Sequence, residues 1–230
     1  MPKTIPFLIE AVLDSPVILS PDAYLTLDSL LSASCQLRGE DDAHLPLRRT
    51  ADVYHASAGI LVGNPITSEA PFVARLTVRD CSNPRIKPNK KSGLIVSTVS
   101  FPDKARLDRY QAFHAAKVIW LGCGDPDETL RILSRLPGLG KRYNAGYGQV
   151  SAYSVTPIQR DFSLQLPDDS LARPVPTRIC QQLGIDLSHA HLDRATYKPN
   201  YFDFTQADLC ALPTTLLINQ DDVDFLKEAA

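Results

Sequence analysis

The stretch Leu136-Pro-Gly-Leu-Gly-Lys-Arg-Tyr-Asn-Ala-Gly-Tyr-Gly-Gln149 is the most unusual part of this 230-residue chain. Four of the eleven glycines fall within it: Gly138, Gly140, Gly146 and Gly148. Glycine lets the backbone turn through conformations closed to residues with a Cβ atom, and it lets a ligand approach the main chain. Two adjacent cations, Lys141 and Arg142, follow the second glycine. Cations beside such a turn predict that the ligand is an anion.

The flanking elements decide which anion-binding motif this glycine loop can be. Residues 125–136 read as a helix, because Pro126 suits a first turn and leucines recur at helical spacing. Residues 149–155 alternate as a strand does. A dinucleotide fingerprint and a phosphate-binding P-loop both need the order strand, loop, helix, because the phosphate sits at the helix amino terminus. The order here is the reverse, so we exclude both motifs.

A simpler alternative is that the glycines only make a tight connection, with the cations solvated on its surface. A single turn does not require four glycines within so short a span. The loop also interleaves them with Lys141, Arg142, Tyr143 and Tyr147, which favours a ligand-binding role.

The helix, the pattern G-x-G-[basic]-[basic]-x-x-x-G-[aromatic]-G and the following strand resemble the glycine-rich loop of the CRISPR-associated RAMP superfamily. Its members carry a ferredoxin-like, RRM-type domain and bind CRISPR RNA. Within it, the chain looks most like the Cas-five-type subunit of type IV effector complexes. Shorter supporting pieces are residues 27–31 on an early helix, residues 54–58 on a strand, and the late Tyr197-Lys-Pro-Asn-Tyr201. The resemblance covers residues 5–213.

Composition and cysteine usage narrow the class of protein. Apolar residues make up 44% and charged residues 22%, which is ordinary for a globular soluble protein. No apolar run approaches the roughly 20 residues of a membrane span, and the amino terminus lacks a secretory pattern, so we expect a cytoplasmic protein with no membrane partner. The five cysteines are scattered and never paired at C-x-x-C spacing, which predicts buried free thiols, no metal and no cofactor. They are Cys35, Cys81, Cys123, Cys180 and Cys210.

The order of predicted elements indicates an α+β fold. We expect strands at residues 5–13, 53–62, 116–121 and 149–155, helices at 23–37 and 125–136, and hairpin strands at 72–79 and 94–99. This is the ferredoxin-like (RRM-type) βαββαβ order over residues 1–155, with a basic β-hairpin inserted at about residues 70–100. Connection handedness puts both helices on one face of the sheet, which leaves the opposite face and the glycine loop for RNA.

Residues 156–230 form a proline-rich C-terminal segment whose composition differs from that of residues 1–155. We expect a short helix at residues 177–183. The rest is expected to be an extended tail that packs across the domain, ending in acidic residues that would repel RNA.

We predict RNA-binding residues in three places. In the glycine loop, the amides of Gly138, Gly140, Gly146 and Gly148 would approach phosphates, Lys141 and Arg142 would neutralise them, and Tyr143 or Tyr147 would stack on a base. Residues 84–93 form a mobile basic loop that contributes Arg85, Lys87, Lys90 and Lys91. In the RAMP family a hairpin at this place can act as a thumb; the alternative is a solvated hairpin tip. The third place holds Arg48, Arg49 and His55, and for His55 a hydrogen-bonding role is favoured over catalysis.

The resemblance implies a CRISPR RNA-binding structural subunit that grips the five-prime handle and caps the backbone filament in antiviral defence. Implied partners are CRISPR RNA, the backbone RAMP subunits, a large subunit of the effector complex and, through the complex, target DNA.

Two other functions stay open. One is a metal-independent repeat-RNA endoribonuclease of the same fold, which needs a base and a group that stabilises the phosphorane. Candidate groups by type are His44, His55, His114, His189 and His191, with Tyr143 or Lys141 assisting. No spacing forces them together, so we expect no catalytic residue. The other is a small-molecule binding domain of the same fold, against which the basic residues at both loops argue.

Overall fold

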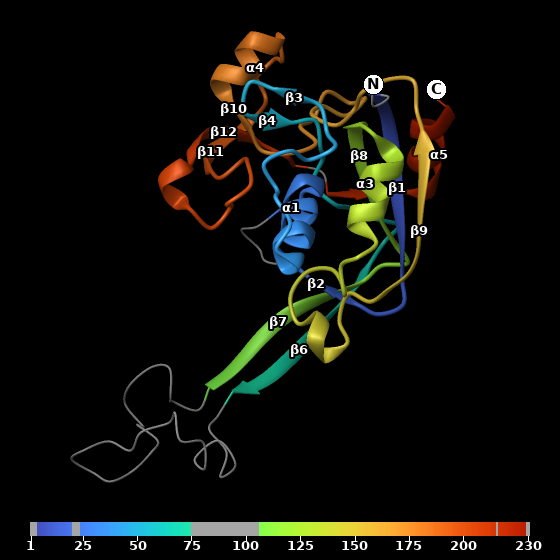
Figure 1. Ribbon diagram of the computed structural model, residues 1–230. Coiled ribbons are helices and arrows are strands. Elements are labelled where there is room, and N and C mark those ends of the chain that lie inside the picture. Colours follow the sequence, from blue (N-terminus) through green and yellow to red (C-terminus); the bar gives the residue numbers. More distant parts are fainter. Residues whose placement is uncertain (1–3, 20–23, 75–105, 215, 229–230) are drawn as a thin grey trace, which may run out of the picture. The chain divides into compact units, whose positions relative to one another are not determined.

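The structure is a computed structural model that describes residues 4–19, 24–74, 106–214 and 216–228 (Figure 1). The chain divides into two compact units. The main unit comprises Met1–Ile66 and Phe113–Ala230, and the inserted unit comprises Thr67–Ala112. Each is described by itself below.

The main unit is built on a mixed five-stranded sheet with the order β13-β5-β8-β1-β9. Its strands are β1 (Ile5–Leu13), β5 (Ile60–Val62), β8 (Lys117–Gly124), β9 (Val150–Pro157) and β13 (Leu217–Ile218). The central strand β1 pairs antiparallel with β8 on one side and with β9 on the other. β5 is antiparallel to β8, and β13 is parallel to β5. The chain is therefore an α+β protein.

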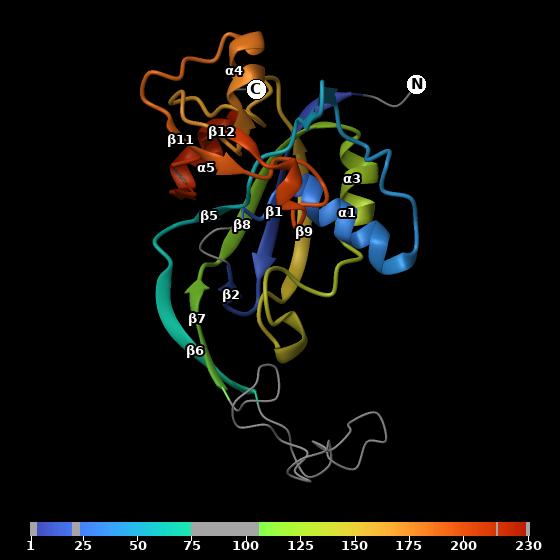
Figure 2. The ribbon, with the colours of Figure 1, turned by 90° about the vertical axis from the view of Figure 1, so that its left-hand side faces the viewer.

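Helices α1 (Leu27–Arg38) and α3 (Pro126–Leu133) cover one face of this sheet (Figure 2). Alternate residues of β1, among them Phe7 and Ile9, point into a core that includes Leu31 of α1 and Leu133 of α3. α1 ends at Gly39, whose φ of 68° suits a residue without a Cβ atom. Both predicted helices exist with different bounds: α1 begins four residues later than predicted and ends one residue later, and α3 begins one residue later and ends three residues earlier.

The C-terminal segment covers the opposite face of the sheet. Leu8 and Leu121 on that face pack in one cluster with Phe162 and with Val223 and Leu226 of α5 (Gln220–Glu228). Glu10 is also largely buried there, and it accepts hydrogen bonds from Lys117 at 3.1 Å and from Lys227 of α5. The expectation that this face is open to RNA is therefore wrong, because the segment folds back over an apolar surface that would otherwise meet water.

The same segment is structured rather than an extended tail. It forms a small sheet of order β10-β12-β11. Its elements are β10 (Val175–Pro176), β11 (His191–Ala195) and β12 (Asp208–Leu212), with α4 at Thr177–Leu183 and a 3₁₀ turn at Phe204–Gln206. A third cluster of buried residues, including Ile179 and Cys210, lies within this part. The predicted bounds of the α4 helix are confirmed.

The predicted strand at residues 53–62 is interrupted. A short ladder joins β3 (Arg49–Thr50) to β4 (Val53–Tyr54), and regular pairing resumes only at β5. Between them the amide of Ala58 donates to the carbonyl of Ala172, while the Ser57 hydroxyl accepts from the amide of Leu121. These hydrogen bonds satisfy backbone groups that a regular strand ladder would otherwise pair. The alternation of residue types in the sequence does not reveal such bonds.

The inserted unit contains β6 (Ile66–Ala74) and β7 (Arg106–His114), which are hydrogen-bonded neighbours. Arg109 pairs with Glu69 at 3.0 Å, and the rings of Phe72 and Tyr110 meet edge to face with centroids 5.8 Å apart. β6 begins before the predicted strand 72–79. The predicted strand 94–99 lies outside the described residues.

No helix in the described ranges is long and apolar enough to cross a membrane. Four cysteines are buried free thiols, as predicted: Cys35, Cys123, Cys180 and Cys210. Cys81 lies outside the described residues.

Candidate nucleic-acid interface

The glycine loop connects α3 to β9 and is anchored at both ends. Asp125 caps the start of α3, where its carboxylate accepts a hydrogen bond from the Glu128 amide at 3.0 Å. At the far end the Gln149 amide donates to the Ser15 hydroxyl at 2.9 Å, which ties the start of β9 to the turn after β1. The loop therefore begins and ends on fixed parts of the main unit.

Two of the glycines are required by the packing of the loop itself. Gly140 and Gly148 have φ values of 69° and 63°. A Cβ atom at Gly140 would lie 2.4 Å from the carbonyl oxygen of Ile18, and one at Gly148 would lie 2.0 Å from the carbonyl oxygen of Leu139. Neither position has space for a side chain, and neither backbone conformation favours one. Packing and backbone conformation alone therefore explain why glycine occupies these two positions.

The outer part of the loop has a different character. Tyr143–Ala145 form a 3₁₀ turn that is bracketed by Arg142 at φ 61° and Gly146 at φ 90°. Among the described residues, no atom outside its immediate chain neighbours lies within 4 Å of the position a Cβ would take at Gly146. Lys141 and Tyr143 are exposed, while Arg142 and Tyr147 are half-buried. This part of the loop presents cations and an aromatic ring to solvent around an exposed backbone turn.

The backbone amides of the loop correct part of our expectation. The Gly148 amide donates to the carbonyl of Pro16 at 2.8 Å, and the Gly146 amide donates to the carbonyl of Tyr143 at 3.1 Å. The Lys141 amide donates to the carbonyl of Ile18. Gly146 and Gly148 therefore do not direct their amides at a ligand in this structure. Phosphate binding here would depend mainly on the side chains of Lys141 and Arg142.

His55 lies inside the main unit rather than on an open face. Its ring nitrogens are 2.6 Å from the carboxylate of Asp161 and 2.8 Å from the hydroxyl of Thr50. Burial acts to raise the pKa of Asp161, but hydrogen bonds from His55 and Ser163 outweigh it and lower the pKa to about 2. A contact between His55 and RNA would require these hydrogen bonds to break.

Arg48 and Arg49 are exposed at the other end of the sheet from the glycine loop. The connection that carries them pairs with the Gly124 end of β8, through a bridge between Leu47 and Gly124. The glycine loop joins the opposite end, where β1 and β8 finish their ladder at Val12 and Lys117. The two places lie at opposite ends of the sheet in both views (Figures 1 and 2).

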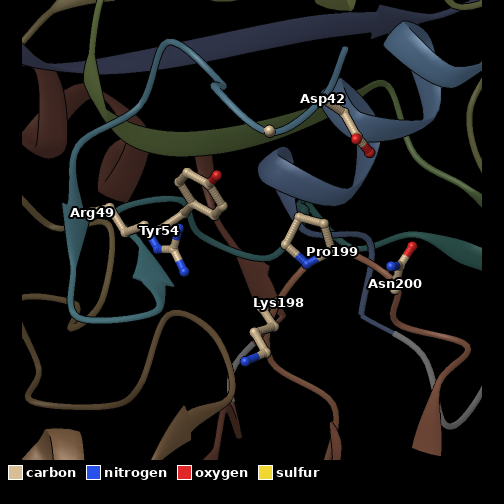
Figure 3. Close-up of a pocket in the computed structure, with 7 residues that line it drawn as sticks. Asp42, Arg49, Tyr54, Lys198, Pro199 and Asn200 are labelled. Carbon is tan, nitrogen blue, oxygen red and sulfur yellow. The ribbon is translucent and has the colours of Figure 1, made fainter. Parts of the chain in front are cut away.

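Arg49 lines an open pocket of about 260 Å³. Figure 3 shows the other labelled lining residues: Asp42, Tyr54, Lys198, Pro199 and Asn200. The Arg49 guanidinium lies over the Tyr54 ring at 5.4 Å, which fixes its direction. Lys198 is 3.1 Å from Asp52 and 5.3 Å from the centre of the Tyr197 ring. The pocket thus combines two cations with aromatic and polar groups.

Sequence reasoning missed the second half of this pocket. The sequence places Tyr197, Lys198 and Tyr201 in an aromatic cluster at residues 197–204 and in the family resemblance, but it predicts no role for them. The signal that could have found them is a cation between two tyrosines, followed by Phe202 and Phe204, in a segment otherwise rich in proline and acidic residues. What could not be read is that this segment meets Arg49, which lies about 150 residues earlier.

The predicted basic loop at residues 84–93 lies outside the described residues, and with it Arg85, Lys87, Lys90 and Lys91. Within the part of the chain that is described, no three His, Cys, Asp or Glu side chains gather as metal ligands would.

No protein-family model matches the chain, and no curated protein matches it at a significant level.

Proposed function

We propose that the protein is an RNA-binding structural subunit of a type IV CRISPR effector complex. In this role it grips the five-prime handle of CRISPR RNA and caps the backbone filament. The observation that carries the proposal is the glycine loop, in which two cations and a tyrosine surround an exposed turn between a helix and a strand. Cations neutralise phosphates and aromatic rings stack on splayed bases, which is how unpaired RNA is held.

The arrangement of the main sheet supports the family part of the proposal. Leaving out β13, the order β5-β8-β1-β9 corresponds to second, third, first and fourth strands along the βαββαβ path. Both intervening helices, α1 and α3, pack on the same core of buried residues. This is the arrangement expected of a ferredoxin-like domain, in which the glycine loop follows the second helix. A fold of this kind hosts many functions, so the loop and not the fold carries the functional part.

Binding to a repeat RNA tests the proposal. The purified full-length protein is titrated with RNA transcribed from the repeat of the CRISPR array in the same genome, in the presence of a metal chelator. A scrambled RNA of the same composition serves as the control. We expect tighter binding to the repeat than to the scrambled RNA, with the RNA recovered intact.

Two results would change the assignment. Equal affinity for the repeat and the scrambled RNA would contradict recognition of the handle. A single defined cut in the repeat RNA would favour the endoribonuclease alternative, for which the hydrogen-bonded pair of His55 and Asp161 is the first place to substitute.

A further inference from the structure

We propose that the pocket lined by Arg49 and Lys198 holds one unpaired nucleotide of the bound RNA, and that the neighbouring Phe202 and Phe204 stack on adjacent bases. This inference rests on the proposed function and adds to it a second contact site at the far end of the sheet from the glycine loop. We call it the aromatic pocket; it comprises the pocket of Figure 3 and residues 202–204.

Two cations that line the pocket of Figure 3, Arg49 and Lys198, are suited to bind a phosphate. Among the described residues, no carboxylate lies within 4.0 Å of the Arg49 guanidinium, so its charge is available to a ligand. Lys198 adds a second positive charge, although it is shared with Asp52 at 3.1 Å. A guanidinium held against an aromatic ring is preorganised, because less side-chain freedom is lost when it binds.

Among the described residues, Asp42 lines the pocket of Figure 3, and Asp203, which lies between the two phenylalanines, is the other acidic group of the aromatic pocket. The Asp42 carboxylate accepts hydrogen bonds from the Ser32 hydroxyl and from the Gln36 amide at 2.8 Å, both through Oδ2. These bonds hold the pKa of Asp42 below its ordinary value, so the group is ionised at neutral pH. Its second oxygen is suited to accept from a ribose 2′-hydroxyl, a donor that RNA has and DNA lacks.

The two phenylalanines are unusual for their exposure. Phe202 is 94% exposed and Phe204 is 78% exposed. They lie on a connection between β11 and β12 whose neighbours are firmly tied. The Tyr201 hydroxyl donates to Asp28 at 2.7 Å, the Thr196 hydroxyl donates to the Tyr201 carbonyl at 3.0 Å, and the Asp203 amide donates to the Asn200 carbonyl at 2.7 Å.

Hydrogen bonds hold this connection in place, yet it exposes two apolar rings to water. Such exposure favours a partner that covers the rings. Lys198, which precedes Phe202 by four residues in the chain, favours a polyanion over an apolar protein surface. Base stacking on exposed aromatic rings, combined with cations that track the backbone, is the usual way in which single strands are bound. The modest volume of the pocket, about 260 Å³, fits one nucleotide unit better than a large ligand.

The test measures binding of fluorescein-labelled single-stranded U12 RNA to full-length protein by anisotropy, across a range of salt concentrations. Three variants are compared with wild type: Phe202→Ala, Arg49→Gln, and the glycine-loop double variant Lys141→Ala/Arg142→Ala. Matched controls are Phe225→Ala, an exposed ring on α5, and Arg38→Gln, an exposed cation at the end of α1. Circular dichroism confirms that each variant is folded.

We expect Phe202→Ala to weaken binding about 5-fold or more, as loss of a stacking platform does. Arg49→Gln should weaken binding and flatten the log-log salt slope by about 0.7, the value for one phosphate on a single strand. The two controls should bind as wild type does. A 12-base-pair RNA duplex should show no effect of Phe202→Ala, because its bases are already stacked on one another.

The outcomes separate this inference from the proposed function. If Phe202→Ala and Arg49→Gln bind like wild type while the glycine-loop variant binds less well, the aromatic pocket is overturned and the proposed function stands. If Phe202→Ala leaves RNA binding unchanged but abolishes association with another subunit, the aromatic pocket is a protein-docking surface and this inference is overturned. If wild type binds neither U12 nor the repeat RNA, the proposed function fails and this inference fails with it. If wild type binds the repeat RNA but not U12, only this inference is overturned.

Discussion

At the scale of single residues, the most consequential group is Arg173, which is fully buried. Its guanidinium pairs with Asp28 at 3.2 Å and donates to the carbonyls of Tyr54 and Ala56 and to the Tyr201 hydroxyl. One cation therefore links the C-terminal segment to α1 and to the stretch after β4. Sequence alone does not distinguish this arginine from the exposed ones, because its partners are distant along the chain.

Replacing Arg173 with Met should destabilise the protein strongly. The substitution leaves Asp28 as an unpaired buried charge, and breaking such a pair costs about 3–5 kcal/mol. Urea unfolding measures the loss. Arg131→Met is the matched control, since Arg131 forms an exposed ion pair with Glu128, and it should change the free energy of unfolding far less than Arg173→Met does. Equal effects of the two substitutions would contradict a structural role for the buried pair.

A second prediction at this scale concerns Asp161 and pH. Its folded-state pKa of about 2 lies below the ordinary value of 3.8. Ionised Asp161 therefore stabilises the fold above about pH 4, and this contribution is lost as the pH falls towards 2. From the size of the shift, wild type should exceed Asp161→Asn by about 2 kcal/mol in free energy of unfolding at pH 6, and this gap should close by pH 2. Urea unfolding at several pH values checks it. A gap independent of pH would show that the carboxylate charge does not contribute.

At the scale of elements, the glycine loop has two kinds of glycine that substitution should distinguish. Gly148→Ala places a methyl group where the Leu139 carbonyl lies, whereas Gly146→Ala places it more than 4 Å from the described residues other than its chain neighbours. Both residues have positive φ, which costs a non-glycine residue about 1–2 kcal/mol. Only Gly148→Ala adds a steric clash, so it should lower the midpoint of urea unfolding clearly more than Gly146→Ala does. Equal midpoints would contradict the described packing of the loop.

Local sequence patterns predicted some elements well and others poorly, for physical reasons. The strand β1 and the helix α4 match their predicted bounds, because periodicity and terminal residues are local signals. The C-terminal small sheet and the α5 helix were not predicted. The nine-residue acidic helix α5 packs on the main sheet, and the short strands of the small sheet pack in a separate cluster with α4. The stability of both therefore comes from tertiary contacts that a local pattern does not contain. The interrupted strand at 53–62 was misread because its hydrogen-bond partners lie far away in sequence.

The candidate site was likewise only partly predictable from the sequence. Composition indicated the glycine loop, since glycines and cations are concentrated in one short stretch. The partner residues of Arg49 were not predictable, because no local pattern links Arg49 to Lys198.

At the scale of the whole molecule, the main unit should fold without the inserted unit. All three clusters of buried residues described above belong to the main unit. Replacing residues 67–112 with a six-residue Gly-Ser linker changes a loop length, and the entropy of loop closure depends only weakly on length. We expect a single cooperative urea transition, followed by the fluorescence of Trp120, which is buried and is the one tryptophan of the chain. Solvent-exposed Trp120 emission in the absence of urea would contradict independence of the main unit.

In the proposed function, the glycine loop binds RNA phosphates through Lys141 and Arg142. The most direct measurement is the salt dependence of binding between the full-length protein and a short repeat-derived RNA, for wild type and for Lys141→Ala/Arg142→Ala. Arg38→Ala/Arg131→Ala, which removes two exposed cations from helices, is the matched control. We predict weaker binding and a log-log slope flatter by about 1 to 2 units in the loop variant, given about 0.7 per phosphate on a single strand. Unchanged affinity and slope in a folded loop variant would contradict the claim and leave the loop as a structural connection.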